Sequence, residues 1–279
     1  MIHPAAVDLA TGRPDPERMV FMLNPEDEVA VEAALQLREA HPDCSITLLT
    51  AGTADAEDAL RRAGAMGGRV IDSMMRIDFE PTDAWTAAVV LAAALRRLGF
   101  DLVLCGCRAA DTNGGQVGSF IAELLDVPQV SGIVNLDLRS TRPQLVVERN
   151  LGRGDREEVE CSLPALLTVD AALHVPHYPT FPDRSFAERT CIDRIEPAAL
   201  VTGATEALVE FGKLTPPRPR TRKVFTIDTG LSVADRMSQM VTGGAVRKEG
   251  GAVVQDTPDE AARQIVAFLL EHGFVPGVR

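Results

Sequence analysis

The sequence is short of aromatic residues, of positive charge and of long apolar runs, and each shortage excludes a class of function. One Trp and one Tyr occur among 279 residues, so a stacking platform for nucleic-acid bases is not expected. The net charge of −12 disfavours binding to nucleic acid or to an anionic membrane. No apolar run approaches the ~20 residues that span a bilayer, and no signal sequence opens the chain. These features predict a cytoplasmic protein that does not insert into membranes.

Cysteine and histidine patterns predict neither a metal site nor a catalytic site. The five cysteines are scattered, and Cys105 and Cys107 form CxC rather than the CxxC of zinc and redox motifs. We therefore expect reduced thiols. No serine lies in a nucleophile elbow, no Glu/His pair has metal spacing, and no cysteine has a convincing histidine partner. The chain is thus expected to be no enzyme and to carry neither catalytic residues nor metal ligands.

What the sequence does contain is a regular alternation of short apolar strands with helices. Helices are expected at about 24–40, 54–66 and 83–98 and again from residue 117, and strands at 45–50, 70–71 and 102–105. Asn24 precedes Pro25 and three acids, which is the pattern of a helix N-terminus. The alternation predicts an α/β fold, a parallel sheet with helices on both faces. Ligands of such sheets bind at the carboxyl ends of the strands, here the turn at 50–52 and the loop at 106–116.

The second half of the chain has a different pattern. Apolar and polar residues alternate in three segments between 130 and 161, which predicts an antiparallel meander, and the apolar run 163–169 predicts a further strand. Residues 170–196 read as loop. A proline-rich arm follows, with room for a short helix at 204–211, and a last helix is expected at 257–273.

The loop at 106–115 is the first candidate site. It joins the apolar run 102–105 to a helix beginning near Val117, and the first N–H groups of a helix have no intrahelical acceptor and bind anions. Its glycines follow neither GxGxxG nor GxxxxGK[ST]. The pattern therefore leaves two interpretations open, a phosphate site for an adenine nucleotide or an ordinary strand-to-helix turn.

Over about residues 20–190 the chain resembles the β subunit of electron transfer flavoproteins. The order and spacing of several short motifs carry the resemblance. They are LNPxDExAVExA from Leu23, AxAMG from Ala63, DLVL from Asp101 with Gly106, Ala109 and Asp111, QxG from Gln116, VPQ from Val127, VER from Val147, LPALLTVD from Leu163 and PxYxTxP from Pro176.

This resemblance implies an α/β fold of the adenine nucleotide alpha hydrolase-like type, with an antiparallel extension and a C-terminal arm that ends in a helix. Residues 1–195 would form the nucleotide-binding domain, its first strand missing or truncated, and residues 196–279 an arm that packs on an FAD-bearing α subunit. The heterodimer would accept electrons from flavoprotein dehydrogenases and pass them to a downstream acceptor, with no chemistry by this chain itself.

The resemblance also implies a nucleotide site on this chain, holding AMP or a second FAD. The loop 106–115 would wrap the nucleotide, and Asp111 is expected to fix the loop, because a carboxylate beside a phosphate is repulsive. Val117 lacks the hydroxyl of AMP-binding members. The implied nucleotide-binding residues are Asn24, Ala51, Gly106, Asp111, Gly114, Gly115, Gln116 and Val117.

A second implied site is the segment 176–184, which would dock the dehydrogenases through Tyr178, Phe181 and Pro182. Phe181 would be either an exposed anchor or part of a small satellite core, and the anchor is favoured because hot spots fill pockets with large residues. His174 and His177 are expected on the loop surface. Two alternative functions stay open: a bifurcating-type subunit with its own FAD, and a stand-alone nucleotide-binding sensor resembling universal stress proteins.

Overall fold

The computed structural model describes residues 21–139, 144–201, 206–209, 212, 232–233, 237 and 257–271, together with the strand residues 7–8 and 13–14. Contacts divide the chain into two units, Met1–Pro217 and Arg218–Arg279, and each is described by itself. In the first unit, β1 (Val7–Asp8) and β2 (Arg13–Pro14) form a small antiparallel pair.

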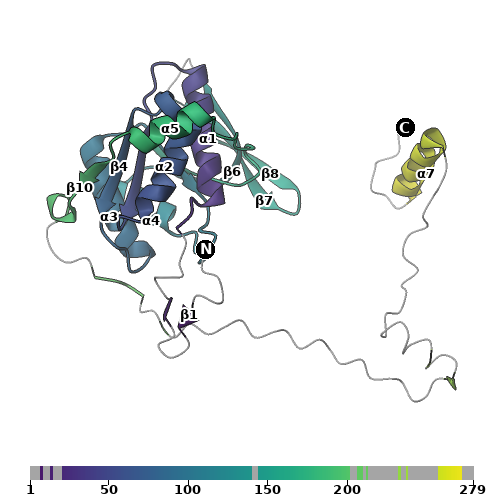
Figure 1. Cartoon of the computed structure of the whole chain (residues 1–279). Coiled ribbons are helices and arrows are strands. Elements are labelled where there is room, and N and C mark those ends of the chain that lie inside the picture. The colour runs from purple at the N-terminus through teal and green to yellow at the C-terminus, as the bar shows by residue number, and fades with distance from the viewer. Residues whose placement is uncertain are drawn as a thin grey trace. The chain divides into compact units, whose positions relative to one another are not determined.

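Parallel strands form the centre of the first unit, in two sheets (Figure 1). The three-stranded sheet has the order β10-β4-β3, all parallel: β3 (Thr47–Gly52), β4 (Ser73–Asp78) and β10 (Asp193–Ile195). The five-stranded sheet has the order β5-β9-β6-β7-β8: β5 (Leu102–Gly106), β6 (Gln129–Arg139), β7 (Gln144–Gly152), β8 (Asp155–Ser162) and β9 (Ala165–Val169). In it β5, β9 and β6 run parallel, whereas β7 and β8 extend the sheet as an antiparallel hairpin.

Helices cover both faces, as predicted. They are α1 (Pro25–Ala40), α2 (Ala56–Gly67), α3 (Ala84–Leu98), α4 (Val117–Leu125) and α5 (Phe181–Arg189). The helix α1 packs Val29 against the cluster of β9 and β6, and Val31 on the side of Leu48 in β3. On the other face, α3 packs Ala92 beside α4 and Val90 beside Leu49. Both α1 and α3 therefore join the two sheets, whose edge strands β3 and β5 are not paired with each other in the described part of the chain.

Local signals account for the elements that were predicted correctly. Asp83 caps α3 through a capping box with Thr86, accepting from the Thr86 N–H at 2.8 Å. The meander matches its alternating pattern, and the turn between β7 and β8 places Gly152, Arg153 and Gly154 all at positive φ. In the second unit, α7 (Pro258–Glu271) forms where the sequence predicts a helix. None of its residues is buried, and Ile265 and Phe268 are more than half exposed.

Two predictions were wrong. The strand expected at 70–71 is instead a short helix, η3 (Gly68–Val70), and the strand is β4, whose apolar pattern is interrupted by the buried Arg76. Residues 170–196 are not all loop, because they contain α5 and β10. A signal for α5 was present: Thr180 caps the Asp183 N–H, and Pro182 lies in the first turn. Among residues 204–211, the described residues 206–209 are not helical. No helix in the described ranges is long and apolar enough to cross a membrane.

Candidate functional site

The loop after β5 is fastened to the first turn of α1. Asn24 precedes α1 but makes no cap bond within it. Its amide instead donates to the Arg108 carbonyl at 2.9 Å and accepts from the Ala110 N–H at 3.0 Å. Because one side chain bonds to two points of the loop, Asn24 fixes the position of the loop relative to the start of α1.

Two acids of the same turn complete this attachment. Asp27 accepts from the Gly106 N–H and Glu26 from the Arg108 N–H, each at 2.6 Å. Burial raises the pKa of Asp27, although the Gly106 hydrogen bond acts against that shift. Gly106 allows this close approach, since a Cβ there would lie 2.8 Å from the Glu26 Cβ. The backbone donors at 106 and 108 are therefore already used and do not face a ligand.

The free donors lie further along, at the N-terminus of α4. In the described part of the chain, the backbone N–H groups of residues 114–119 have no hydrogen-bond acceptor, and Gln116 makes no cap bond. Residues 111–116 are exposed, and Gly115 has a φ of 62°, which a glycine adopts without strain. A row of unpaired N–H groups at a helix N-terminus attracts an anion, and we call the N–H groups of residues 114–119 the donor row.

A close contact holds α4 against the sheet beneath this row. A Cβ on the buried Gly118 would lie 2.7 Å from the Thr168 Cγ2 and 3.3 Å from the Cys105 Sγ. Thr168 cannot rotate away without losing a hydrogen bond, because its hydroxyl accepts from the Gly132 N–H at 3.1 Å. Glycine at 118 therefore sets how deeply the helix N-terminus sits above β5 and β9.

The structure brings together most, but not all, of the residues expected at the nucleotide. Asn24 and Gly106 meet directly, and Gly114, Gly115, Gln116 and Val117 form the donor row. The Asp111 carboxylate accepts from the Thr112 N–H at 2.6 Å, a contact within the loop. Ala51 packs beside Leu49 in the α3-facing cluster, and no hydrogen bond of the described residues ties it to the 106–115 loop.

The two cysteines near the loop are poor nucleophiles. Burial raises the pKa of the Cys105 thiol to about 12 and that of Cys107 to about 11, so both stay protonated near neutral pH. All five cysteines are free thiols. No group of three or more metal-ligating side chains occurs among the residues that the structure describes.

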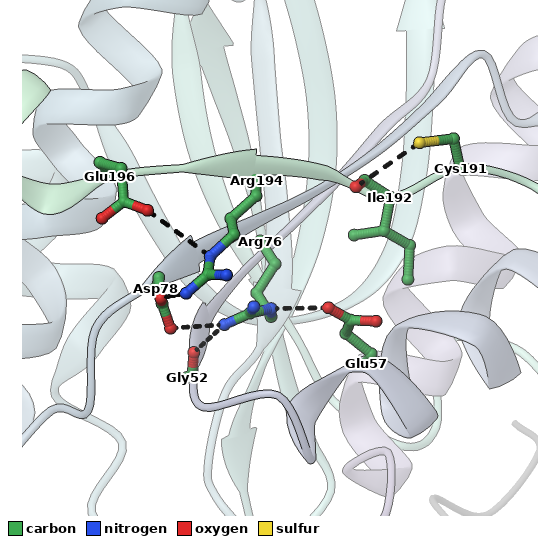
Figure 2. Close-up of polar contacts among 8 residues, drawn as sticks. All are labelled: Gly52, Glu57, Arg76, Asp78, Cys191, Ile192, Arg194 and Glu196. Carbon is green, nitrogen blue, oxygen red and sulfur yellow. Dashed lines mark hydrogen bonds and ion pairs between the residues drawn. The ribbon is translucent and has the colours of Figure 1, made fainter.

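A second polar cluster lies at the ends of β3 and β4, and the sequence analysis did not find it (Figure 2). Arg76 is 3% exposed. Its guanidinium donates to Glu57 at 3.0 Å, to Asp78 at 2.8 Å and to the Gly52 carbonyl at 2.9 Å. Asp78 also pairs with the more exposed Arg194 of β10. Arg76 therefore links the end of β3 to the first turn of α2.

The residues expected to dock a partner lie at the start of α5 and are strongly exposed. Tyr178 is 90% exposed and Phe181, the first residue of α5, is 82% exposed. The alternative interpretation of Phe181 as part of a satellite core is therefore wrong. Pro182 is also exposed. The helix itself is held on α2, where one Arg61 nitrogen donates to the carbonyls of Ala187, Glu188 and Thr190.

Comparison with known proteins identifies the family of this chain. The electron transfer flavoprotein domain family matches residues 17–205. The chain is 30% identical over 262 residues to the electron transfer flavoprotein subunit beta of Bacillus subtilis, covering 94% of this chain and 90% of that protein. It is 36% identical to the subunit beta of Thermoanaerobacterium thermosaccharolyticum, covering 59% of this chain and 62% of that protein.

A human relative and a relative from a reductase complex agree with this. The chain is 31% identical to the human electron transfer flavoprotein subunit beta, over 70% of this chain and 76% of that protein. It is 33% identical to subunit CarD of the caffeyl-CoA reductase-Etf complex of Acetobacterium woodii, over 62% of this chain and 65% of that protein. The matched region contains both the α4 donor row and the exposed start of α5. The chain therefore belongs to the electron transfer flavoprotein family, among its β subunits.

Proposed function

We propose that this chain is the β subunit of a heterodimer in which an FAD-bearing α subunit carries the electrons and this chain binds AMP. The observation that carries the proposal is the row of N–H groups at residues 114–119 without a described acceptor, beside the loop that Asn24 fixes. AMP needs one phosphate position, and one helix N-terminus supplies it. The redox chemistry belongs to the flavin, and the protein supplies binding and orientation.

The acids near the site do not contradict an anionic ligand. Glu26 and Asp27 direct their oxygens at the N–H groups of Arg108 and Gly106 rather than into the donor row. Glu26 is further paired with the Arg108 guanidinium at 3.4 Å. A carboxylate that accepts backbone donors fixes the loop while its charge is partly compensated. The residues facing the phosphate would then be the backbone of Gly114, Gly115 and Val117, with Gln116 as a neutral donor.

A second FAD on this chain is the other candidate. The exposure of residues 111–116 favours it, since an open loop has room for a larger nucleotide. The deciding experiment is to co-express the heterodimer, denature it and quantify the released nucleotides. One FAD and one AMP per heterodimer is the expected result, and two FAD without AMP would refute AMP binding. If the isolated chain were a stable monomer that bound ATP and ignored the α subunit, the carrier function itself would fail.

The partners follow from the two exposed apolar surfaces. The helix α7 has Val266 and Leu270 exposed on one side and no buried residue, and we assign this side to the α subunit. Tyr178, Phe181 and Pro182 are assigned to flavoprotein dehydrogenases, because large apolar side chains on a rigid support make effective hot spots.

Replacing Asn24 with alanine is expected to weaken AMP binding about tenfold, because two hydrogen bonds that fix the loop are lost. The measurement is equilibrium binding of AMP to the nucleotide-stripped heterodimer. Asn150→Ala is the matched control: it removes an amide that accepts from the Gly152 N–H at 2.8 Å in the distant β7–β8 turn. Unchanged affinity for Asn24→Ala, or equal weakening by the control, would contradict the assignment.

Replacing Phe181 with alanine is expected to raise the KM for a reduced acyl-CoA dehydrogenase about tenfold while kcat and flavin content stay the same. Stopped-flow and steady-state reduction of the heterodimer measure this. Leu151→Ala, which truncates a 56% exposed side chain near the end of β7, should have no effect. Loss of flavin in Phe181→Ala would instead indicate a structural role.

A further inference from the structure

The docking segment before α5 has a single polar tether among the residues that the structure describes. Between residues 174 and 179, only His177 makes hydrogen bonds to another element. Val175 and Tyr178 are each 90% exposed, and Pro176 and Pro179 have no N–H to donate. The position of this segment on the α/β body therefore depends strongly on His177, which the sequence analysis had expected merely on the loop surface.

The two ring nitrogens of His177 face two different acceptors. Nδ1 lies 2.6 Å from a carboxylate oxygen of Glu32 in α1, and Nε2 lies 2.8 Å from the Met66 carbonyl in α2. A carbonyl oxygen only accepts, so Nε2 carries a proton. Nδ1 also carries one if Glu32 is ionised, and His177 is then an imidazolium.

Other contacts favour the ionised form of Glu32. Its two oxygens also accept from the Gln36 amide at 3.1 Å and from the His177 backbone N–H at 3.3 Å. Burial acts to raise the pKa of Glu32, but the hydrogen bonds from Gln36 and His177 outweigh it and the pKa is lowered. Glu32 is 8% exposed, so without these donors its charge would be unfavourable.

We propose that His177, held as an imidazolium between Glu32 and the Met66 carbonyl, positions the partner-docking segment, and that docking weakens when it loses its proton. The inference rests on the docking function proposed above for residues 176–184. His177 is a positioning residue, because it acts through the exposed side chains on either side of it. The charged groups that face it are Glu32 from α1 and Asp183 from α5, with the Met66 carbonyl from α2.

The direction of the pH dependence follows from these contacts. The hydrogen bond to Glu32 raises the pKa of His177 above 6.5, while partial burial acts against the shift. The stabilisation is thus fully present below pH 6.5 and is lost as pH rises through the raised pKa. The contribution of Glu32 is present above pH 4.5 and is lost as pH falls through its lowered pKa. The tether is therefore strongest between the pKa of Glu32 and that of His177, and it loosens as pH rises through the pKa of His177.

The first test measures the tether without any dehydrogenase. Hydrogen exchange of residues 174–180 is followed in the purified heterodimer for His177→Gln, His177→Arg and the matched control His174→Gln. Dividing the exchange rate of each variant by that of the control at the same pH removes the intrinsic pH dependence of exchange. We expect His177→Gln to exchange about threefold to tenfold faster at pH 6 and to approach wild type at pH 9. His177→Arg introduces a permanent cation, so residues 174–180 should exchange slowly at both pH values.

Two results would overturn the tether. One is an unchanged exchange rate in His177→Gln at pH 6. The other is an NMR titration that places the ring pKa of His177 at or below 6.5 in the wild-type heterodimer, a measurement that needs no variant to fold.

The second test concerns docking and separates this inference from the proposed function. The KM for a reduced acyl-CoA dehydrogenase should rise with pH in wild type and in His174→Gln, and should be flat in His177→Arg, with kcat unchanged. If exchange responds but the KM does not, the positioning role is overturned. If Phe181→Ala also leaves the KM unchanged, the docking function of the segment has itself failed.

Discussion

Replacing Arg76 with leucine is expected to lower the free energy of unfolding by about 3 kcal/mol, the cost of removing one partner of a buried ion pair. Arg76 is 3% exposed and supplies donors to Glu57, to Asp78 and to the carbonyl of the buried Gly52. Leucine has no hydrogen-bond donor. The Gly52 carbonyl therefore loses its hydrogen bond, and Glu57 loses the cation with which it pairs. Thermal unfolding should show a fall of roughly 6–12 °C in Tm for a chain of this size.

Arg194→Leu is the matched control for Arg76. Arg194 lies beside Arg76 in the register of β10 and β4 and pairs with the same Asp78, but its side chain is 57% exposed. Water therefore replaces its ion pair at little cost, and we expect a change below about 1 kcal/mol. Equal destabilisation by the two variants would show that burial of Arg76 is not what makes its contacts important.

Gly118→Ala is expected to destabilise the protein by about 2 kcal/mol, because the added Cβ overfills the contact between α4 and β9. The methyl would lie 2.7 Å from the Thr168 Cγ2, and Thr168 is held in place by the Gly132 N–H. Either α4 moves outward or Thr168 rotates and loses its hydrogen bond. Chemical denaturation measures the loss. A shift of α4 would also displace the donor row, so weaker AMP binding should accompany it.

Thr168→Ser provides the decisive comparison, since it removes the obstructing methyl and keeps the hydroxyl. Combined with Gly118→Ala it should recover about 1 kcal/mol relative to the sum of the single changes. Gly114→Ala, in the loop that precedes α4, is the control: the atom nearest to a Cβ there is the Thr112 hydroxyl at 3.4 Å, an ordinary contact. Strict additivity of the Gly118 and Thr168 changes would contradict a direct contact.

The elements that were predicted correctly are those with strong local signals. Asp83 and Pro25 mark helix starts in any context, because capping and proline geometry act within one turn. The strand β4 was misplaced for the opposite reason. Its Arg76 interrupts the apolar pattern, and the burial of Arg76 depends on two acceptors from other elements, Glu57 of α2 and the Gly52 carbonyl of β3. The strand β10, three residues long, is specified by pairing with β4 rather than by its own composition.

The candidate nucleotide site also combines features that local sequence predicts with features that depend on distant residues. The sequence placed a strand, a glycine-containing loop and a helix start in order, and the structure contains all three. It interpreted Asn24 as a helix cap, whereas the side chain binds the loop at Arg108 and Ala110. A cap is a contact within one turn, but these two contacts span 84 and 86 residues, and only packing of α1 against β5 brings the partners together.

Periodicity and helix caps predicted an α/β protein, and a resemblance in the order of short motifs indicated the electron transfer flavoprotein β subunits, since all these signals are carried by neighbouring residues. Tertiary structure decided which backbone donors remain available, that Gly106 and Gly118 must lack side chains, and that the His177 ring lies between Glu32 and the Met66 carbonyl. Each of these depends on atoms from distant segments meeting within about 3 Å, where hydrogen bonding and overlap are settled. Residue order constrains such distances weakly, because long-range contacts form only when the whole core packs.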